Sequence, residues 1–408
     1  MKKLISVILA AVLICSLTAA CTSAADKPAE TENPATENNE TAVTTEETVA
    51  LTGDPIKIGL PAPLSGSSGA IGEGLVNSAK LAADQINAAG GIHGRPVEIL
   101  AEDDEMTASK AVTVANKLVY QDKVDALIGN LNSTACLATQ EITNKAGMIQ
   151  MALGSNRKVT EMGHKYVFRM QANDLYQAAA VVKYVVDTMG YTKVACLYAS
   201  DDFGTGGKNV VVEELDARNL ELVACEAFDP DTSDVTSQLT SIKAANPDAV
   251  IMWCMYQPGA LICKQMNQMG MGNIPKFGGG GLVNVALYEL AGETAKGLCM
   301  TQLFFPSEDA ANEKGKKFIA DYQAAYGSTP DNNCGMVYDA AMVLMTAMQN
   351  APETMTSDEI AEQLHAINYE GVTGSLTFSD TGDVVRDLTI VSIGEGGVYQ
   401  VVYNPNEQ

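Results

Sequence analysis

The stretch VDALIGNLNSTACLATQEITNKAGMIQMALG, residues 124–154, holds the pattern that decides the fold. VDALIG (124–129) is a short apolar run typical of a buried strand, and GMIQMALG (147–154) is a second one. Between them, after Ser133, alanine, leucine and isoleucine recur with helical spacing. Strand, helix and strand in this order predict a βαβ unit, whose parallel strands are covered on both faces.

The same alternation extends outward in both directions. The strands IKIGLPA (56–62) and VEILAED (97–103) precede the opening stretch, and KVACLYAS (193–200) and DAVIMWCM (248–255) follow it. The first intervening helix should present one apolar face, formed by Leu75, Ala79, Ala82 and Ile86. The face of the second should be Ala111, Val114, Ala115 and Leu118. After residues 164–174 the series restarts with a helix over 176–189, which predicts two α/β lobes with parallel sheets.

Ligands of open parallel sheets bind beyond the carboxyl ends of the strands. We therefore expect the binding residues directly after VDALIG, KVACLYAS and DAVIMWCM. After the first of these strands, Asn132, Ser133 and Thr134 stand where the chain enters a helix. Such side chains either cap the free N–H groups of the first turn, or those N–H groups face outward and hold an anion. The stretch alone leaves both interpretations open.

Composition narrows the classes of partner. The chain has 408 residues, of which 46% are hydrophobic and 19% charged, and its formal net charge is −24. A surface this acidic repels phosphate backbones, so nucleic-acid binding is not expected. Outside the N-terminus no apolar run approaches the roughly 18–20 residues of a membrane-spanning helix. These values suit a soluble globular protein of about two domains.

The N-terminus carries export signals. Lys2 and Lys3 precede the apolar run LISVILAAVLIC, which predicts a signal peptide over residues 1–20. The small residues before Cys21 resemble the lipobox of bacterial lipoproteins, which implies that Cys21 becomes a lipidated first residue. The alternative is an ordinary secretory signal with an incidental cysteine. Residues 21–53, rich in threonine, glutamate, asparagine and alanine, should then form a disordered, lipid-anchored linker.

The sequence lacks the common signatures of catalysis and metal binding. His93, His164 and His365 lie far apart and outside any HExxH pattern, and no GxSxG or complete phosphate-binding loop occurs. We therefore predict no catalytic residue, no metal site and no cofactor. A binding protein is the expected class.

Two longer stretches identify a family. INAAGGIHGRPVEILAEDDEMTASKAVTVANKLVYQDKVDALIGNLNST (86–134) and FDPDTSDVTSQLTSIKAANPDAVIM (228–252) resemble the leucine/isoleucine/valine-binding proteins. These are type I periplasmic solute-binding proteins of ABC importers. The resemblance runs from about Ile56 to the C-terminus and implies two Rossmann-like lobes joined by a three-crossover hinge. The implied crossings are Phe168–Ala172, Leu298–Leu303 and Gly374–Phe378. The implied lobes are 54–170 with 302–374, and 171–301 with 375–408.

The resemblance also implies ligand contacts on the first lobe. Family members hold the ligand carboxylate with the hydroxyl and N–H of a serine at this helix start, which matches Ser133, with Asn132 beside it. Capping alone remains the alternative. A second hydroxyl comes from the loop ALGSN (152–156), where Ser155 aligns best and Asn156 is its rival because the loop is one residue short.

Across the cleft the resemblance implies an aromatic residue before a glycine, which is Phe203 in SDDFG (200–204). A further wall comes from Met255 or Tyr256, whose register is open. Ile71, expected in the loop after the first strand, takes a place that some members give to tryptophan. Phe203, Tyr256 and Ile71 could equally be core residues.

One position departs from the family. Amino-acid-binding members pair the α-ammonium with an acid in the loop that here reads GGGGLVN (278–284), where Gly281 stands near the expected position. A buried ammonium without a charged partner costs several kcal/mol. Either Asp202 or Glu73 supplies the missing carboxylate, or the ligand has no α-amino group.

These observations predict a monomeric, lipid-anchored solute-binding protein on the outer side of the cell membrane, facing the cell surface or periplasm. It would bind a small carboxylate, such as an amino acid, in an inter-lobe cleft and deliver it to ABC permease subunits. Binding of another carboxylate or an amide is one alternative. A ligand sensor that feeds a membrane receptor is another.

Overall fold

The stretch 124–154 forms the strand, helix and strand that its sequence predicts. The computed structural model describes residues 51–304, 311–386 and 388–404. In it β3 spans Ala126–Ile128, α3 spans Ser133–Ala146 and β4 spans Ile149–Ala152. The two strands pair in parallel, which confirms the βαβ unit. The helix ends at Gly147, whose φ of 63° is a left-handed conformation that glycine adopts without strain.

The first lobe is built on a five-stranded sheet in the order β2-β1-β3-β4-β5, in which every pairing is parallel. The remaining strands are β1 (Ile56–Ala62), β2 (Val97–Asp103) and β5 (Val167–Arg169). Its helices are α1 (Gly69–Ala88), α2 (Ala108–Asn116), α4 (Lys158–Glu161), α10 (Glu313–Tyr326), α11 (Asn332–Asn350) and α12 (Ser357–Ala366). The strand order reverses at β1, which opens a crevice at the carboxyl ends of β1 and β3.

The second lobe contains a seven-stranded sheet in the order β15-β14-β10-β9-β8-β6-β7. Its strands are β6 (Val194–Ala199), β7 (Ala224–Phe228), β8 (Ala249–Trp253), β9 (Lys276–Gly278), β10 (Cys299–Gln302), β14 (Thr389–Ile393) and β15 (Tyr399–Tyr403). Its helices are α5 (Asp174–Val182), α6 (Asp202–Asp216), α7 (Thr236–Ala245), α8 (Tyr256–Gln268) and α9 (Val285–Ala291). The order reverses at β6, between β7 and β8, so this lobe repeats the design of the first.

The C-terminal part departs from the all-parallel prediction. β14 runs antiparallel to both β10 and β15, and β11 (Tyr369–Gly371), β12 (Gly374–Phe378) and β13 (Val384–Val385) form a separate antiparallel sheet. The short connection between β14 and β15 explains the first departure, because only antiparallel neighbours can be joined without a crossover helix.

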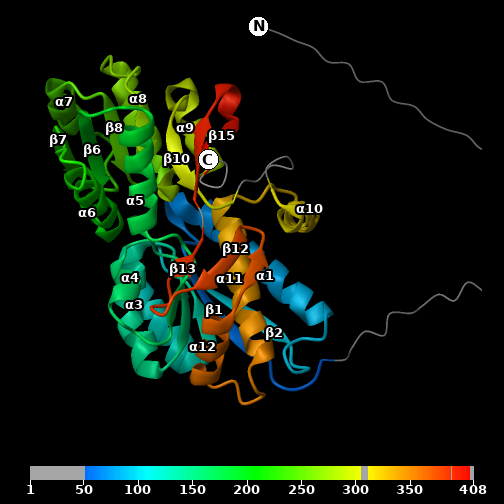
Figure 1. Ribbon diagram of the computed structural model, residues 1–408. Coiled ribbons are helices and arrows are strands. Elements are labelled where there is room, and N and C mark those ends of the chain that lie inside the picture. The colour runs from blue at the N-terminus through cyan, green and yellow to red at the C-terminus, as the bar shows by residue number, and fades with distance from the viewer. Residues whose placement is uncertain (1–50, 305–310, 387, 405–408) are drawn as a thin grey trace, which may run out of the picture. The chain divides into compact units, whose positions relative to one another are not determined.

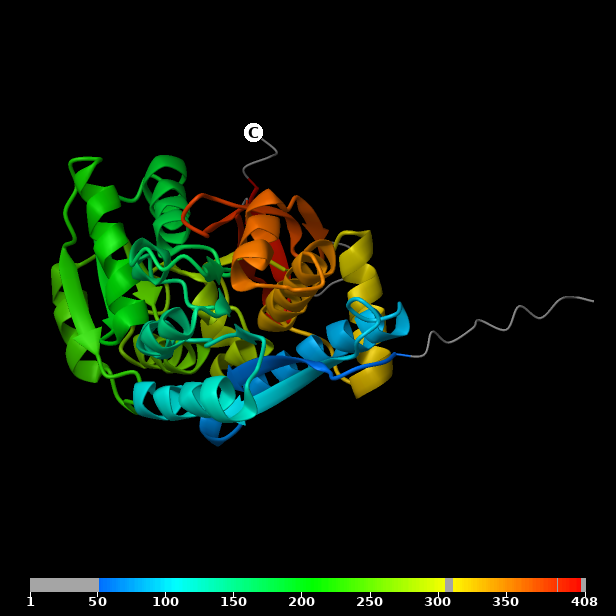
Figure 2. The same cartoon turned by 90° about the horizontal axis from the view of Figure 1, so that it is seen from below.

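The predicted helical faces are buried. Leu75, Ala79, Ala82 and Ile86 of α1 lie in the core. Ala111, Val114 and Ala115 of α2 are buried as well, and so is Leu118 in the π-helical segment Lys117–Asp122 that continues it. α1 also packs against α10 and α11, which come from far along the chain, as the two ribbon views show (Figures 1 and 2). The core is therefore completed by segments that return from the second lobe.

The chain passes between its two large sheets after β5, after β10 and after β13. It leaves β5 at Arg169 and enters α5 at Asp174, and it later leaves β10 at Gln302. The third stretch differs, because Gly374–Phe378 is strand β12 of the small sheet. The chain rejoins the seven-stranded sheet only at β14, so the C-terminal segment of lobe two starts later than residue 375.

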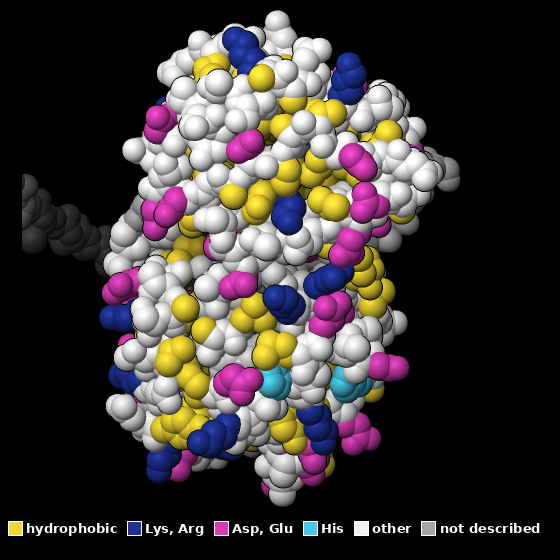
Figure 3. Space-filling model, turned by 90° about the vertical axis from the view of Figure 1, so that its left-hand side faces the viewer, with side chains coloured by type: hydrophobic (Ala, Val, Ile, Leu, Met, Phe, Trp, Pro, Cys, Tyr) yellow, Lys and Arg dark blue, Asp and Glu magenta, His cyan; other side chains and the backbone are white. Residues whose placement is uncertain are grey.

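The predicted signal peptide, Cys21 and most of the linker lie outside the described residues. Within the part of the chain that the structure describes, no helix is both long and apolar enough to cross a membrane. On the face shown in Figure 3, acidic and basic side chains are intermingled, without a large area of one sign.

Candidate functional site

A cavity lies where the carboxyl ends of strands from both lobes meet. Its volume is about 520 Å³, including space open to solvent. From the first lobe, the segments after β3 and β4 line it with Leu131, Asn132, Ser133, Leu153 and Ser155. From the second lobe, the segments after β6, β8 and β9 contribute Asp201, Phe203, Met255, Gly280 and Gly281. The three strand ends expected from the sequence therefore contribute to one cavity.

Asn132 caps the helix that points at this cavity. Its Oδ1 accepts the N–H of Ala135 at 2.8 Å, and its Nδ2 donates to the carbonyl of Met106 at 2.7 Å. The cap therefore serves the third residue of α3 and leaves the N–H groups of Ser133 and Thr134 to other partners. Helix capping and anion binding are therefore compatible here, because Asn132 caps the helix and the N–H groups of Ser133 and Thr134 are left for a ligand.

Ser133 is the first residue of α3 and is 1% exposed. Its Oγ accepts the backbone N–H of Asn156 at 3.1 Å. A hydroxyl that accepts a hydrogen bond still has its own hydrogen to donate. With the positive end of the helix dipole behind it, Ser133 is suited to meet a carboxylate.

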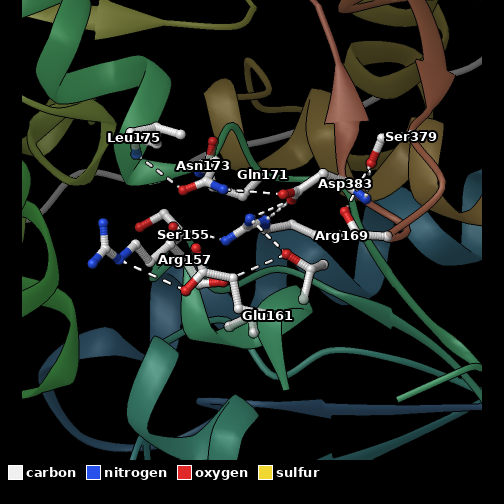
Figure 4. A network of polar contacts seen from close by, with 12 residues as sticks. Ser155, Arg157, Glu161, Arg169, Gln171, Asn173, Leu175, Ser379 and Asp383 are labelled. Carbon is white, nitrogen blue, oxygen red and sulfur yellow. Dashed lines mark hydrogen bonds and ion pairs between the residues drawn. The ribbon is translucent and has the colours of Figure 1, made fainter. Parts of the chain in front are cut away.

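Arg169 fixes the loop that carries Ser155 (Figure 4). Its side chain is fully buried, and its Nη1 donates to the carbonyls of Ser155 at 2.9 Å and Asn156 at 2.7 Å. Its Nε donates to Oδ1 of Asp383 at 2.6 Å, and Asp383 also accepts from Asn173 at 3.0 Å. Because Arg169 ends β5 and Asp383 lies between β12 and β13, this ion pair ties the Ser155–Asn156 loop to both of these segments.

Glycines shape the wall that the second lobe contributes to the cavity. A Cβ at Gly281 would lie 2.7 Å from the Phe203 ring and 2.8 Å from the carbonyl oxygen of Cys254. The preceding N–H, of Gly280, donates to Oε1 of Gln177 at 2.7 Å. Glycine here lets the loop lie against Phe203, and no carboxylate side chain fits at position 281 unless the wall moves.

Asp201 is a cavity residue that the sequence analysis missed. It is the N-cap of α6, where its Oδ1 accepts the N–H of Gly204 at 2.8 Å. Burial raises the pKa of its carboxyl, and the charge of Asp202 adds to that rise. The usable signal was its place directly after the strand KVACLYAS, which mirrors the place of Asn132. Asp202 itself, one of the two acids proposed from the sequence, does not line this cavity.

Four other expected residues lie elsewhere. Ile71 is not in a loop but in α1, and together with Tyr256 and Glu73 it lines a second cavity. Met255 lines the first cavity, whereas Tyr256 lines the second. Asn156 does not line the first cavity either; its Nδ2 donates across the lobes to the carbonyl of Asp202 at 2.5 Å.

Further polar contacts join the two lobes. Thr134 Oγ1 accepts the N–H of Asp202 at 3.3 Å, and Arg157 pairs with Glu213 at 2.9 Å. Asn284 donates to Asp331 at 2.9 Å. The structure thus holds the two lobes together around the cavity.

Asp174 is a buried acid behind the binding loop. Its N–H donates to the carbonyl of Ser155 at 2.8 Å. Neither of its carboxyl oxygens has a hydrogen-bond partner in the described chain, and the indole N–H of Trp253 is also without one. Burial raises the pKa of Asp174 to about 7. At neutral pH this group is therefore partly protonated.

No group of three or more histidine, cysteine, aspartate or glutamate side chains that could hold a metal occurs within residues 51–304, 311–386 and 388–404. The cavity instead combines a helix N-terminus, hydroxyls, amides, one carboxylate and apolar side chains. This is the composition of a site for a small organic solute.

Comparison with known proteins agrees with this geometry. The model of the family described as periplasmic binding protein matches residues 55–397. An amino acid binding protein of Pseudomonas aeruginosa is 28% identical over 348 residues, which cover 84% of this chain and 91% of that protein. The Leu/Ile/Val-binding protein of Escherichia coli K12 is 26% identical over 332 residues, or 81% of this chain and 88% of that one.

A solved structure is similar throughout the body. It is the branched-chain amino acid transporter substrate binding protein of Streptococcus pneumoniae in complex with isoleucine. The TM-score is 0.77 at 29% identity, with 85% of this chain and 99% of that chain covered. The chain therefore belongs to the leucine/isoleucine/valine-binding family of periplasmic binding proteins.

Proposed function

We propose that this chain is the extracytoplasmic solute-binding lipoprotein of an ABC importer, and that it binds a small carboxylate-bearing solute, in first place an amino acid, between its lobes. One observation carries the proposal. Ser133 stands at the N-terminus of α3 and faces the cavity, while Asn132 takes over the capping of the helix. A helix start arranged in this way holds a carboxylate without a basic side chain.

The relatives support the class of solute. One of them is named a Leu/Ile/Val-binding protein, and the solved relative holds isoleucine. The contacts across the rim support a mechanism in which solute favours the closed arrangement of the lobes, and the closed form docks on the permease. Lipidation at Cys21 would keep the protein at the membrane, and Cys21→Ala should release it into the soluble fraction.

A second candidate is a solute without an ammonium group, such as a simple carboxylate or an amide. The observation that favours it is the glycine at position 281, where a carboxylate side chain would collide with Phe203. The choice between the two depends on whether another acid reaches the solute.

The first test is the affinity of Ser133→Ala. The purified protein is unfolded and refolded to remove bound solute, and amino acids, ammonium-free carboxylates and amides are screened by thermal shift. A solute at about 100 times its Kd adds about 2.7 kcal/mol to the free energy of unfolding, which raises the melting temperature by several degrees.

For the solute found, Ser133→Ala should weaken binding about tenfold or more, because the lost hydrogen bond goes to a charged group. Its melting temperature without solute should stay near that of the parent protein. Ser237→Ala, at the exposed start of α7, is the matched control. Equal affinity of all three proteins would remove Ser133 from the site.

A further inference from the structure

Two cysteines lie side by side at one edge of the seven-stranded sheet. β6 and β7 pair in parallel, and their register places Cys196 of β6 beside Cys225 of β7. Both are free thiols, and neither lines the solute cavity. We propose that Cys196 and Cys225 form a redox-active pair, which a peroxide converts into a reversible disulfide bond. This modification site is independent of the proposed function.

The spacing of the backbone is the first argument. Neighbouring strands lie about 4.8 Å apart, and side chains in register point to the same face of the sheet. A disulfide bond joins residues whose Cα atoms are about 4.4–6.8 Å apart. The pairing of β6 with β7 therefore already holds the two cysteines at a bonding separation, and the fold need not change.

Access to the two thiols is the second argument. The strand order ends in β8-β6-β7, so β7 is an edge strand and β6 is not. Cys225 is exposed, whereas Cys196 is 0% exposed. Among the cysteines that the structure describes, the others are buried as well. An oxidant in solution therefore meets Cys225 first, and Cys196 is placed to react with the product.

The third argument is the different proton affinity of the two sulfur atoms. A hydrogen bond from Cys196 and the charge of Lys208 lower the pKa of Cys225 to about 7, although burial and Glu226 oppose this. The same hydrogen bond, together with burial, raises the pKa of Cys196 well above its usual range. Lys208 is held over the ring of Tyr198, 5.4 Å from its centroid and two residues beyond Cys196. Because the thiolate is the nucleophile, Cys225 attacks and Cys196 keeps its proton.

The reaction balances with one molecule of hydrogen peroxide. The Cys225 thiolate attacks a peroxide oxygen, the O–O bond breaks and hydroxide leaves, so that Cys225 becomes a sulfenic acid. The Cys196 sulfur then attacks the Cys225 sulfur, the S–O bond breaks, and water leaves with the Cys196 proton. Two thiols and one peroxide thus give one disulfide and two water molecules. The thiols lose the two electrons that the peroxide gains.

The bond would close residues 196–225 into a ring that contains the whole of α6. The start of this ring carries Asp201 and Phe203, which line the cavity from the second lobe. A closed ring restricts the unfolded chain, so the oxidised protein should melt several degrees above the reduced protein.

The test is peptide mapping of the whole purified protein. The protein is first reduced and then treated with a few equivalents of hydrogen peroxide, and the remaining thiols are blocked with N-ethylmaleimide before digestion with trypsin. The two cysteines are released on peptides 194–208 and 219–243, each of which contains one cysteine and no methionine. The mass of the linked peptides therefore identifies the bond, and oxidation of methionine does not disturb the measurement.

In the parent protein the two peptides should be joined, and dithiothreitol should separate them. Cys263→Ala removes a buried cysteine of α8 and is the matched control, which should give the same linked pair. In Cys225→Ser, peptide 194–208 should stay unoxidised, and peroxide should no longer raise the melting temperature. In Cys196→Ala, the sulfenic acid should persist at Cys225 and react with dimedone.

Three results would contradict the inference. Unlinked peptides in the peroxide-treated parent protein would overturn the redox pair. A bond between two copies of peptide 219–243 would assign the oxidation to contact between molecules and would also overturn the pair. A linked pair without a rise in the melting temperature would overturn the stabilising effect of the ring and leave the modification site standing.

Discussion

The two walls of the cavity are built by opposite means. On the first lobe, Ser133 and the Ser155–Asn156 loop are fixed by hydrogen bonds that end in the buried Arg169. On the second lobe, glycines let the backbone pack against Phe203 and Trp253. Hydrogen bonds hold the first wall in place, whereas close packing around glycines shapes the second. We therefore expect substitutions in the two walls to affect stability and solute binding in different ways.

The largest loss of stability should come from removing the buried ion pair beneath the first wall. Asp383→Ala leaves the fully buried Arg169 without its counter-charge, although its bonds to Ser155, Asn156 and Thr160 remain. Loss of one partner of a buried ion pair costs about 3–5 kcal/mol. Urea unfolding should show this loss.

The control is the exposed pair Arg157–Glu213, whose side chains are 37% and 50% exposed. Glu213→Ala should change the free energy of unfolding by less than about 1 kcal/mol. Equal losses for the two variants would contradict the structural role of the buried pair.

The next effect should depend on pH. Burial raises the pKa of Asp174 from its ordinary value near 3.8 to about 7, so the folded state holds a proton that the unfolded state releases. Stability from this group is complete below pH 4 and is lost as the pH rises toward and through 7.

Asp174→Asn should therefore gain stability over the parent at pH 8, by about 2–4 kcal/mol, and much less at pH 4. Urea unfolding at both pH values measures the difference. A constant difference between the variant and the parent at the two pH values would show that Asp174 does not titrate in this range.

A third variant probes the packing of the second wall. A Cβ at Gly207 in α6 would lie 2.0 Å from Nε1 of Trp253, which is fully buried. Gly207→Ala should cost about 1–3 kcal/mol through overpacking, although alanine is the better helix former. Asn209→Ala, on the exposed side of the same helix, should stay within about 0.5 kcal/mol of the parent. A Gly207→Ala protein more stable than the parent would contradict the close packing of this helix against Trp253.

The smallest effect should come from the rim that joins the walls. Thr134→Ala removes the acceptor for the Asp202 N–H, one hydrogen bond worth about 1 kcal/mol. Solute affinity should fall by less than tenfold, measured by calorimetry, because only the closed form loses the bond. Thr240→Ala, on the exposed face of α7, serves as control. A loss as large as that expected for Ser133→Ala would place Thr134 in the site itself.

The sequence predicts the first wall better than the second. Periodicity locates the strand and helix around Ser133, and the cap at Asn132 is a local signal. Ile71 was misplaced because the glycine-rich segment 66–74 looks like a loop. Tertiary packing makes it helical, and a Cβ at Gly72 would meet the Pro63 carbonyl at 2.0 Å. Asp201 was missed although its place directly after KVACLYAS, as the N-cap of α6, mirrors that of Asn132, and its neighbour Asp202 does not line the cavity.

The repeated crevice has a consequence for protein engineering. Most residues that line the cavity lie in segments that directly follow strands, and the helices α5 and α11 contribute only Gln177 and Asn333. A library confined to the segments after β6 and β8 could retune recognition and leave the carboxylate grip of the first lobe unchanged. Such variants would be modular biosensors. The first lobe would bind the carboxylate that all target solutes share, and the second lobe would distinguish the solutes by the rest of their structure.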